Sequence, residues 1–417
     1  MARDAKVMDR LPNRWLFVAA AIAMQAVLGN LYSWSIFRDP LMDEHGWSLA
    51  QATVPFQLSI AFFALGVIVA GRWQDRVGPR RVAVTGGVIL GSGFLLASFV
   101  GDSLWGLYLS YGALGGLGIG FAYVTPIATC VKWFPDMRGT VTGLAVLGFG
   151  AGTVIGAPVG TALIDRIGVY QTFALGGLFG LAVVVAGTVL RNPPESFRPQ
   201  GWTPAAARAA AREFGPTEMA RTWQFYVLWV TYLLWAGVGL MAISQAAPMG
   251  EELADLTSKA AAGALSTMAI FNGLGRPSYG WLSDRVGRRA AALLAQGVYV
   301  VALLAVLPNA GSFPAYALGI SMVGFSFGGA LGMMPALTAD YYGTKNLGVN
   351  YGWMFTAYGT AGILGPLIAV QVHEATGAWT NVFFILAGLS VVTAVLALVL
   401  RPPHRVEEPA AEARRAA

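Results

Sequence analysis

The residue with the clearest chemical potential in this chain is Arg276, because it lies inside a long apolar stretch. The stretch begins near Lys259 and reaches its polar end at Asp284, eight residues after Arg276. In a helix, eight residues correspond to about 12 Å. If the stretch crosses a membrane with a hydrocarbon core about 30 Å thick, the guanidinium lies near the middle. A charge there costs at least about 2.5 kcal/mol, and such residues usually face a cavity or a partner.

A guanidinium at this depth predicts an anion site, since its planar fork matches a carboxylate with two hydrogen bonds. Asn272 lies one turn earlier on the same helix face. No acidic residue lies at comparable depth, and Asp340, near the end of its own apolar run, is a borderline case. Arg276 therefore lacks an internal counterion, which a substrate anion would supply. The alternative is a structural arginine that bonds backbone carbonyls or extends toward the cytoplasm.

Polar and aromatic side chains in other apolar runs are candidates to complete the site. Tyr123 and Tyr358 lie at least eight residues inside their runs, deeper than the interface where membrane tyrosines gather. Aromatic residues near them can wall an apolar pocket, although simple packing is the more common role. The candidate binding residues are Arg276, Asn272, Tyr123, Tyr358, Leu28, Phe355, Phe327, Gln25 and Asn30.

The composition indicates a membrane protein with many spans. Of 417 residues, 56% are hydrophobic and 12% charged, and the mean hydropathy is +0.60; soluble domains carry about 25% charged residues. The net charge of +6 follows from where the cations lie and does not indicate nucleic-acid binding. The single cysteine, Cys130, excludes an intrachain disulfide and a cysteine metal cluster. The three histidines are scattered, and we expect no metal and no cofactor.

The apolar runs predict an all-α membrane protein with twelve transmembrane helices, arranged as two pseudo-symmetric six-helix bundles around a central cavity. The expected domains are an N-terminal bundle (1–191), a cytoplasmic linker (192–221), a C-terminal bundle (222–401) and a disordered tail (402–417). Within the linker, residues 204–213 can form a short interfacial helix. The predicted spans are 15–37, 52–71, 81–100, 104–131, 140–164, 170–190, 222–246, 259–280, 289–309, 313–338, 347–371 and 380–400.

The distribution of basic residues predicts the orientation. With these spans, 23 of the 27 lysines and arginines fall on one side, together with both termini and the linker. Only Arg38, Arg166 and Lys259 fall on the other side, and Arg276 belongs to neither. The positive-inside rule therefore predicts that both termini lie in the cytoplasm. We expect the protein to lie in the cell (inner) membrane.

The two halves repeat with one constant offset. A shift of 209 residues carries Gly71-x-x-x-Asp75-Arg76-Val-Gly78 onto Gly280-x-x-x-Asp284-Arg285-Val-Gly287. The same shift carries Pro126 onto Pro335, Gly139 onto Gly348 and Gly156 onto Gly365. Two parallel six-helix repeats place a central cleft between the halves.

The doubled Gly-x-x-x-Asp-Arg-x-Gly-x-Arg-Arg motif, in the loops after spans 2 and 8, resembles the signature of the major facilitator superfamily. The resemblance covers all twelve spans. It implies that Asp75, Arg76, Asp284 and Arg285 belong to a gate, in which the carboxylates hold their half against neighbouring helix ends in one conformation.

The segment Phe271-Asn272-Gly-x-x-Arg276-Pro, with Trp133-Phe-Pro-Asp136-x-Arg-Gly139 and Asn350-Tyr-Gly352, resembles the monocarboxylate porter family and its oxalate–formate antiporter branch. In that family the span-8 arginine binds substrate carboxylate, and the role transfers to Arg276. Two departures matter. Oxalate-type members have a lysine in span 11 where Tyr358 aligns, and animal members have an aspartate where Asn272 stands.

These departures shape the predicted function. One buried cation neutralises one carboxylate, so a dianion would leave a buried charge that costs several kcal/mol. We therefore predict a secondary transporter of small monocarboxylates such as lactate or pyruvate, coupled to protons by symport. The alternative is an anion antiporter of the oxalate–formate kind, because no acid beside Arg276 can take the proton. The expected partners are the monocarboxylate, a proton and the lipid bilayer, and we expect a monomer.

Two other classes of function find less support. A membrane enzyme would need a nucleophile–base pair, metal ligands or a nucleotide loop, and we find no catalytic residues of these kinds. A receptor would normally add a soluble output domain, for which the linker of about thirty residues is too short.

Overall fold

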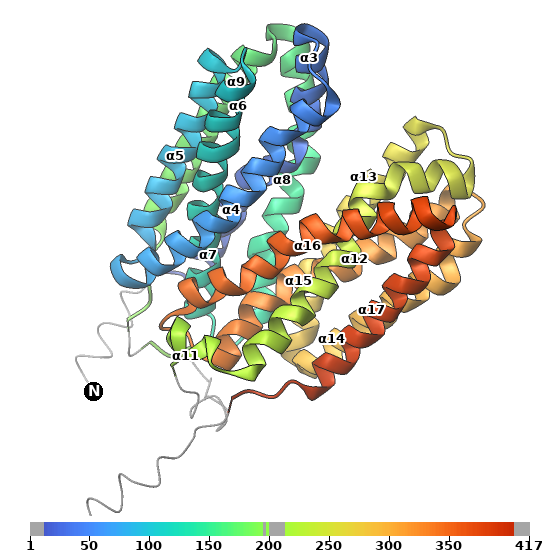
Figure 1. Ribbon diagram of the computed structural model, residues 1–417. Helices are drawn as coiled ribbons and strands as arrows, with labels where there is room; N and C mark the ends of the chain where they lie inside the picture. Colours follow the sequence, from blue (N-terminus) through green and yellow to red (C-terminus); the bar gives the residue numbers. More distant parts are fainter. Residues whose placement is uncertain (1–11, 195–196, 200–212, 404–417) are drawn as a thin grey trace, which may run out of the picture.

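The computed structural model describes residues 12–194, 197–199 and 213–403, and these residues are almost entirely helical. Figure 1 shows two helical bundles that meet near the end where the short helix α11 lies and diverge toward the opposite end. The first six spans form one bundle and the last six form the other, so the predicted fold class is confirmed.

The N-terminal bundle is built from six spans, two of which are interrupted by irregular turns of helix. They are α2 (Trp15–Leu28) with η1 (Gly29–Ser33) and α3 (Ser35–His45), α4 (Leu49–Val77), α5 (Pro79–Val100), α6 (Leu104–Leu107) with η2 (Tyr108–Gly115) and α7 (Gly116–Trp133), α8 (Arg138–Ile167), and α9 (Val169–Val189).

The C-terminal bundle follows a short helix, α11 (Pro216–Ala220), in the linker. Its spans are α12 (Trp223–Ala254), α13 (Ser258–Val286), α14 (Arg288–Val301) with η3 (Ala302–Val306) and η4 (Leu307–Asn309), α15 (Phe313–Tyr342), α16 (Leu347–Thr376), and α17 (Trp379–Val399).

Each helix lies where an apolar run predicted a span, but several are longer than predicted. The first span continues from 37 to His45, and the seventh continues from 246 to Ala254. A helix of thirty residues is about 45 Å long, whereas the hydrocarbon core is about 30 Å thick. Hydropathy marks only the part of a helix inside the core, so the polar extensions beyond it were missed.

Eleven helices of the described chain are long and apolar enough to cross a membrane. The remaining long helix is α13, which is made less apolar by Asn272, Arg276 and several small residues. The helix expected over 204–213 and nearly all of the tail expected over 402–417 lie outside the described residues.

The repeat predicted from the sequence is visible in matching turns. Gly78 separates α4 from α5 with φ +88°, and Gly287 separates α13 from α14 with φ +89°. Residues that carry a side chain rarely adopt a backbone conformation with positive φ, whereas glycine adopts it without steric cost. The glycines of the doubled motif are therefore explained by two equivalent tight turns.

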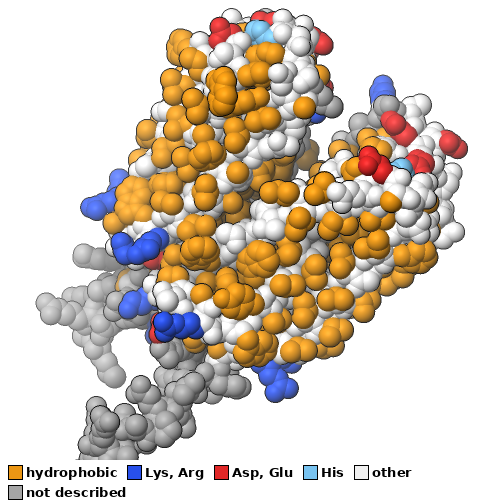
Figure 2. All heavy atoms as spheres, viewed as in Figure 1, with side chains coloured by type: hydrophobic (Ala, Val, Ile, Leu, Met, Phe, Trp, Pro, Cys, Tyr) orange, Lys and Arg blue, Asp and Glu red, His pale blue; other side chains and the backbone are white. Residues whose placement is uncertain are grey.

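The halves contact each other mainly through two equivalent helix pairs, α4 with α16 and α8 with α13. Figure 2 shows a notch between the halves at the end opposite α11. It also shows most of the basic side chains near the end where α11 lies, and mainly acidic and histidine side chains at the opposite end. The protein is thus closed on the side of the linker and separated on the other.

Paired glycines allow this closure. A Cβ atom added to Gly280 would lie 2.2 Å from the carbonyl oxygen of Gly139, and one added to Gly71 would lie 2.2 Å from that of Gly348. Real Cβ atoms never approach backbone oxygen so closely, so the two helix backbones can meet only where both residues lack side chains.

We expect Gly280→Ala to disfavour this closed state, because the added methyl group forces α13 away from α8. Exposure of linker-side residues to a membrane-impermeant thiol reagent, introduced as single cysteines, should increase. Gly297→Ala is the matched control, since a Cβ there meets nothing within 4 Å. Equal labelling of both variants would show that the glycine contact does not govern closure.

Candidate functional site

Arg276 lies on α13 between the two halves and is buried, with 2% of its surface exposed. Its Nη1 donates a hydrogen bond to the backbone oxygen of Val146 on α8 (2.6 Å), and its Nη2 donates to Oδ1 of Asn272 (2.9 Å). Its Nε has no partner among the described residues. No carboxylate pairs with Arg276 in the described part of the chain, so its charge is not neutralised by a neighbouring acid.

The guanidinium borders a cavity of about 10 Å³, which is the room of about one water molecule. Both halves contribute to the lining. It consists of Tyr32, Phe63, Tyr123, Phe149, Arg276, Leu331, Phe355 and Tyr358. Arg276 is the only charged residue in this lining, and the other side chains are aromatic apart from one leucine.

A hydrogen bond between two tyrosines joins the halves beside this cavity. The hydroxyl of Tyr32, in the irregular turn η1, bonds the hydroxyl of Tyr358 on α16. Phe355 stacks on Tyr358 with ring centroids 5.0 Å apart, and Tyr123 lies 5.1 Å from Phe355. These contacts leave no room for a carboxylate, so a substrate can enter only if the aromatic side chains separate.

The structure brings several of the predicted site residues together. Tyr123, Tyr358 and Phe355 line the cavity with Arg276, and Asn272 bonds the guanidinium while donating to the Gly324 oxygen. Phe327 lies behind the lining, stacked on Tyr358 with an interplanar angle of 3°.

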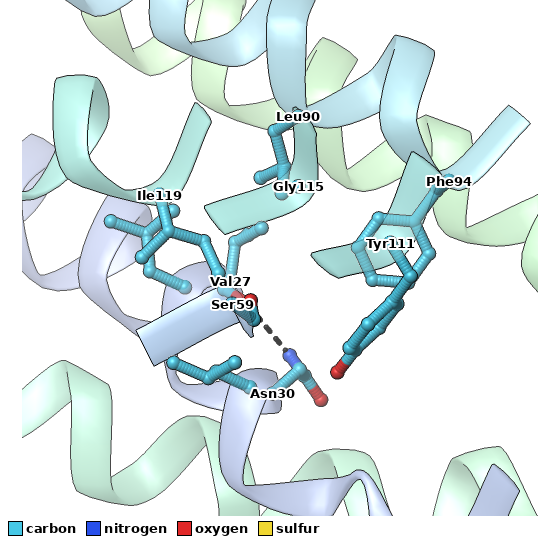
Figure 3. Close-up of a pocket in the computed structure, with 10 residues that line it drawn as sticks. Val27, Asn30, Ser59, Leu90, Phe94, Tyr111, Gly115 and Ile119 are labelled. Carbon is cyan, nitrogen blue, oxygen red and sulfur yellow. Dashed lines mark hydrogen bonds between the residues drawn. The ribbon is translucent and has the colours of Figure 1, made fainter. Parts of the chain in front are cut away.

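The three candidates from the first span lie elsewhere. Gln25 is fully buried, donates to the backbone oxygen of Tyr123 and does not line the cavity. Leu28 and Asn30 border a separate small cavity inside the N-terminal bundle, in which Asn30 bonds the carbonyl of Val27 (Figure 3). Tyr32, four residues after Leu28 in the same span, is the residue that lines the central cavity.

Four lining residues were not predicted: Tyr32, Phe63, Phe149 and Leu331. The repeat held a signal for one of them, because the shift of 209 residues carries Phe149 onto Tyr358. Tyr32 has no such signal, since its position depends on η1, which hydropathy does not reveal. Phe63 and Leu331 are apolar residues in apolar helices, and the sequence does not distinguish them from core residues.

The carboxylates of the doubled motif cap helix N-termini of the opposite half. Asp75, at the end of α4, accepts hydrogen bonds from the backbone N–H groups of Gly348 (3.2 Å) and Val349 (2.9 Å) at the start of α16. Lys132 lies 3.6 Å from the Asp75 carboxylate. A carboxylate is favoured there by the free N–H groups and the positive end of the helix dipole.

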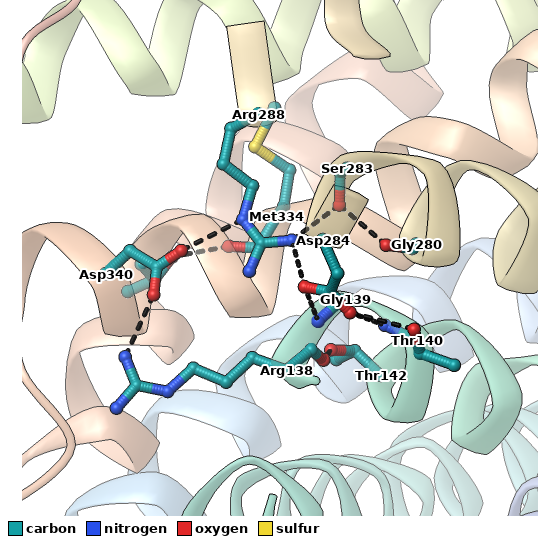
Figure 4. Close-up of polar contacts among 11 residues, drawn as sticks. Arg138, Gly139, Thr140, Thr142, Gly280, Ser283, Asp284, Arg288, Met334 and Asp340 are labelled. Carbon is teal, nitrogen blue, oxygen red and sulfur yellow. Dashed lines mark hydrogen bonds and ion pairs between the residues drawn. The ribbon is translucent and has the colours of Figure 1, made fainter. Parts of the chain in front are cut away.

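Asp284 makes the equivalent contacts at the end of α13 (Figure 4). It accepts from the backbone N–H groups of Gly139 (3.0 Å) and Thr140 (2.7 Å) and from the Thr140 hydroxyl (2.8 Å). The guanidinium of Arg288 donates to Oδ1, the oxygen that also accepts from Gly139, at 2.8 Å. The shift of 209 residues carries Gly139 and Thr140 onto Gly348 and Val349, so the two caps obey the repeat.

A second acid strengthens this contact on one side only. Asp340, on α15, bonds Arg138 of the opposite half and Arg288 of its own half, both at 2.9 Å. Arg76 and Arg285, which the motif suggested for the gate, are exposed, and Arg285 lies over the ring of Trp281 instead. We call the contacts of Asp75, Asp284 and Asp340 at the linker side the latch. Its basic residues are therefore Lys132, Arg138 and Arg288.

Comparison of the sequence with known proteins shows the family to which the chain belongs. The profile of the Major Facilitator Superfamily matches residues 14–257 and 237–417. The oxalate:formate antiporter of Oxalobacter formigenes is 30% identical over 94% of this chain and 92% of its own length. The uncharacterized MFS-type transporter YhjX of Escherichia coli is 30% identical over 84% of this chain and 86% of its own. Monocarboxylate transporter 13 of Bos taurus is 27% identical over 90% and 88%.

Solved structures show the same fold at low sequence identity. The human organic anion transporter MFSD10 superposes with a TM-score of 0.73 at 16% identity, covering 93% of this chain and all of that one. The transporter FucP in its outward conformation gives a TM-score of 0.69 at 17% identity, over 93% and 98% of the two chains. The chain therefore belongs to the major facilitator superfamily, within the group that contains the monocarboxylate porters and the oxalate–formate antiporters.

Proposed function

We propose that the protein carries small monocarboxylate anions across the membrane by alternating access, with Arg276 as the carboxylate-binding group. The observation that carries this proposal is a buried guanidinium, on the boundary between the halves, whose described partners are all neutral. A substrate carboxylate can bind the unbonded Nε together with Nη2, which lies on the same edge of the guanidinium, while Nη1 keeps its bond to the Val146 carbonyl. Bidentate pairing of this kind is both strong and geometrically specific.

The charge of the lining favours monoanions over dianions. A single cation, Arg276, faces the cavity. Tyr358 aligns with the span-11 position at which oxalate-type members of the family have a lysine. A second carboxylate would be buried against aromatic rings without a cation, which costs several kcal/mol. Lactate, pyruvate, glycolate, acetate and formate fit this charge, whereas oxalate does not.

The transport cycle follows from the two sets of contacts between the halves. In the described state the Asp75 and Asp284 caps close the linker side, while the tyrosine pair shields Arg276 from the other side. Transport requires each set to open in turn while the other remains closed. Because the positive-inside rule places the linker and both termini in the cytoplasm, the closed side faces the cytoplasm and the other side lies across the inner membrane.

Two modes of coupling are candidates. Proton symport is our first proposal, with the proton carried by water, by the substrate or by an outer group such as Asp39 or His373. Anion exchange is favoured by one observation: the described lining contains no carboxylate that can take a proton. An exchanger needs no such group, because it reorients only with an anion bound, which neutralises Arg276. The empty protein would have to reorient with an unneutralised buried charge, which is costly.

Counterflow in proteoliposomes distinguishes the two modes. Symport predicts that an inward proton gradient drives lactate uptake into vesicles that contain no anion. Exchange predicts that uptake requires a preloaded monocarboxylate and ignores the pH gradient. If neither condition gives uptake of any monocarboxylate in the panel, the proposed function fails.

Tyr358→Phe tests whether the tyrosine hydroxyl belongs to the binding site. Removing it abolishes the bond to Tyr32 and one donor beside Arg276. A hydrogen bond of this kind contributes about 1 kcal/mol, so we expect an affinity loss of roughly fivefold, measured as the half-saturating concentration for uptake. Tyr226→Phe, on the exposed face of α12, is the control. Unchanged affinity in the Tyr358 variant would remove this residue from the site.

A further inference from the structure

The N-terminal bundle carries a groove that takes no part in the central site. The groove measures about 430 Å³ and lies between the first span, α8 and α9. Ile155 and Val159 of α8 and Leu178 of α9 line it, and each exposes more than half of its surface. Side chains so exposed on transmembrane helices face the bilayer, so the groove opens to lipid and not to the substrate path.

The extent of the groove matches one leaflet of a membrane. α9 has 21 residues, and its length of about 32 Å is close to the 30 Å or so of the hydrocarbon core. The groove follows α9 from Thr172 to Phe179, within the half that begins at Val169. It therefore runs from one surface of the core to near its midplane, in the leaflet opposite the linker.

The lining suits a hydrocarbon chain. Most of its surface is aliphatic or aromatic, and α8 contributes Gly152, Gly156 and Gly160, at which the first span packs closely against α8. Two of its polar side chains are already satisfied as donors, because Asn30 and Thr172 bond carbonyls of their own helices. Ser33 is the remaining one, and its hydroxyl has no partner among the described residues.

A cation lies at the mouth of the groove. Arg166 follows Leu163 by three residues on α8, which places it on the same helix face and one turn nearer the membrane surface. Its side chain is exposed and forms no ion pair with the described residues. Arg38, which follows the lining residue Phe37, is already paired with Asp39 at 2.6 Å. Arg166 is thus the available partner for an anionic head group.

We propose that this groove binds one phospholipid of the leaflet opposite the linker, with an acyl chain along α8 and α9 and the phosphate near Arg166. The chain would pack against residues 30–37 of the first span, where the irregular turn η1 presents Tyr32 to the central cavity. A bound acyl chain therefore supports the segment that shields the substrate site. This inference does not depend on which anion is transported.

Photo-crosslinking in nanodiscs tests this directly, with a phosphatidylglycerol that carries a diazirine in one acyl chain. We expect adducts to concentrate on residues 152–163 and 172–179, as mapped by mass spectrometry of peptides. Val159→Trp fills the groove and should reduce these adducts at least fivefold. Val154→Trp is the matched control, because Val154 lies on the same helix, exposes 44% of its surface and does not line the groove.

A neutral side chain at position 166 should weaken the site if the phosphate contact is real. Arg166→Gln is expected to lower the groove adducts at least twofold, while leaving adducts on the exposed face of α17 unchanged. The tryptophan of Val154→Trp points into lipid and that of Val159→Trp occupies a groove that opens to lipid, so the thermal unfolding of both variants should match that of the wild-type protein. Two results would overturn the proposal. Equal adduct density on the groove and on α17 would show annular lipid only, and groove adducts that Val159→Trp does not reduce would show that the groove is not the binding site.

Discussion

Replacing Arg276 by lysine is expected to reduce monocarboxylate uptake at least tenfold, although the positive charge is retained. Lysine offers a compact ammonium group in place of a planar fork, so one of two charge-assisted hydrogen bonds to the carboxylate is lost. Such a bond contributes about 1.5–3 kcal/mol, which corresponds to a change of about 10- to 150-fold in affinity. Initial rates of lactate uptake in proteoliposomes measure the effect.

Two further variants make this prediction specific. Arg221→Lys changes an exposed arginine of the linker region and should transport normally. Arg276→Gln removes the charge itself, so the loss should exceed that of the lysine variant, because a carboxylate would then be buried without a cation. Near-normal uptake by Arg276→Lys would exclude the arginine as the carboxylate-binding group.

Replacing Asp284 by asparagine is expected to slow transport strongly while substrate binding is largely retained. The carboxylate accepts three hydrogen bonds from Gly139 and Thr140 and pairs with Arg288. Asparagine has one acceptor oxygen and no charge, so the linker-side contact weakens and Arg288 keeps only its bond to Asp340 as an ion pair. A weakening of about 2 kcal/mol, typical of a hydrogen bond to a charged group, changes the ratio of closed to open states roughly 30-fold.

Turnover in proteoliposomes and thermal-shift binding in detergent separate the two effects of this substitution. Asp102→Asn is a suitable control, because this aspartate is exposed in the turn before α6 and forms no ion pair with the described residues. Asp284 has no role in the latch if the asparagine variant loses its binding signal in proportion to turnover.

The repeated motif allowed the linker-side contact to be predicted in outline. Asp75 and Asp284 are recognisable because they recur at one offset, and the residues they cap, Gly139 and Gly348, recur at the same offset. The basic partners were not predictable in this way. The positions of Lys132, Arg138 and Arg288 depend on which helix ends meet across the halves, whereas the motif arginines Arg76 and Arg285 are exposed.

The central site was predictable where a residue was unusual for its surroundings. A charged arginine and an asparagine in an apolar span are costly, so Arg276 and Asn272 were identifiable. Aromatic residues are ordinary in membrane helices, and Phe63 differs from a core phenylalanine only through its place in the fold. Tyr32 was missed in favour of Leu28 and Asn30 because η1 changes which residues of the first span face the cavity.

Binding of a carboxylate and its neutral amide to the purified protein tests the central role of Arg276 most directly. Ligand that binds the folded state raises the unfolding temperature, and at one hundred times the dissociation constant the stabilisation is about 2.7 kcal/mol. We predict that lactate raises the unfolding temperature of the wild-type protein, that lactamide does not, and that neither ligand stabilises Arg276→Gln. An equal shift with lactate in the wild-type protein and in Arg276→Gln would contradict the proposed site.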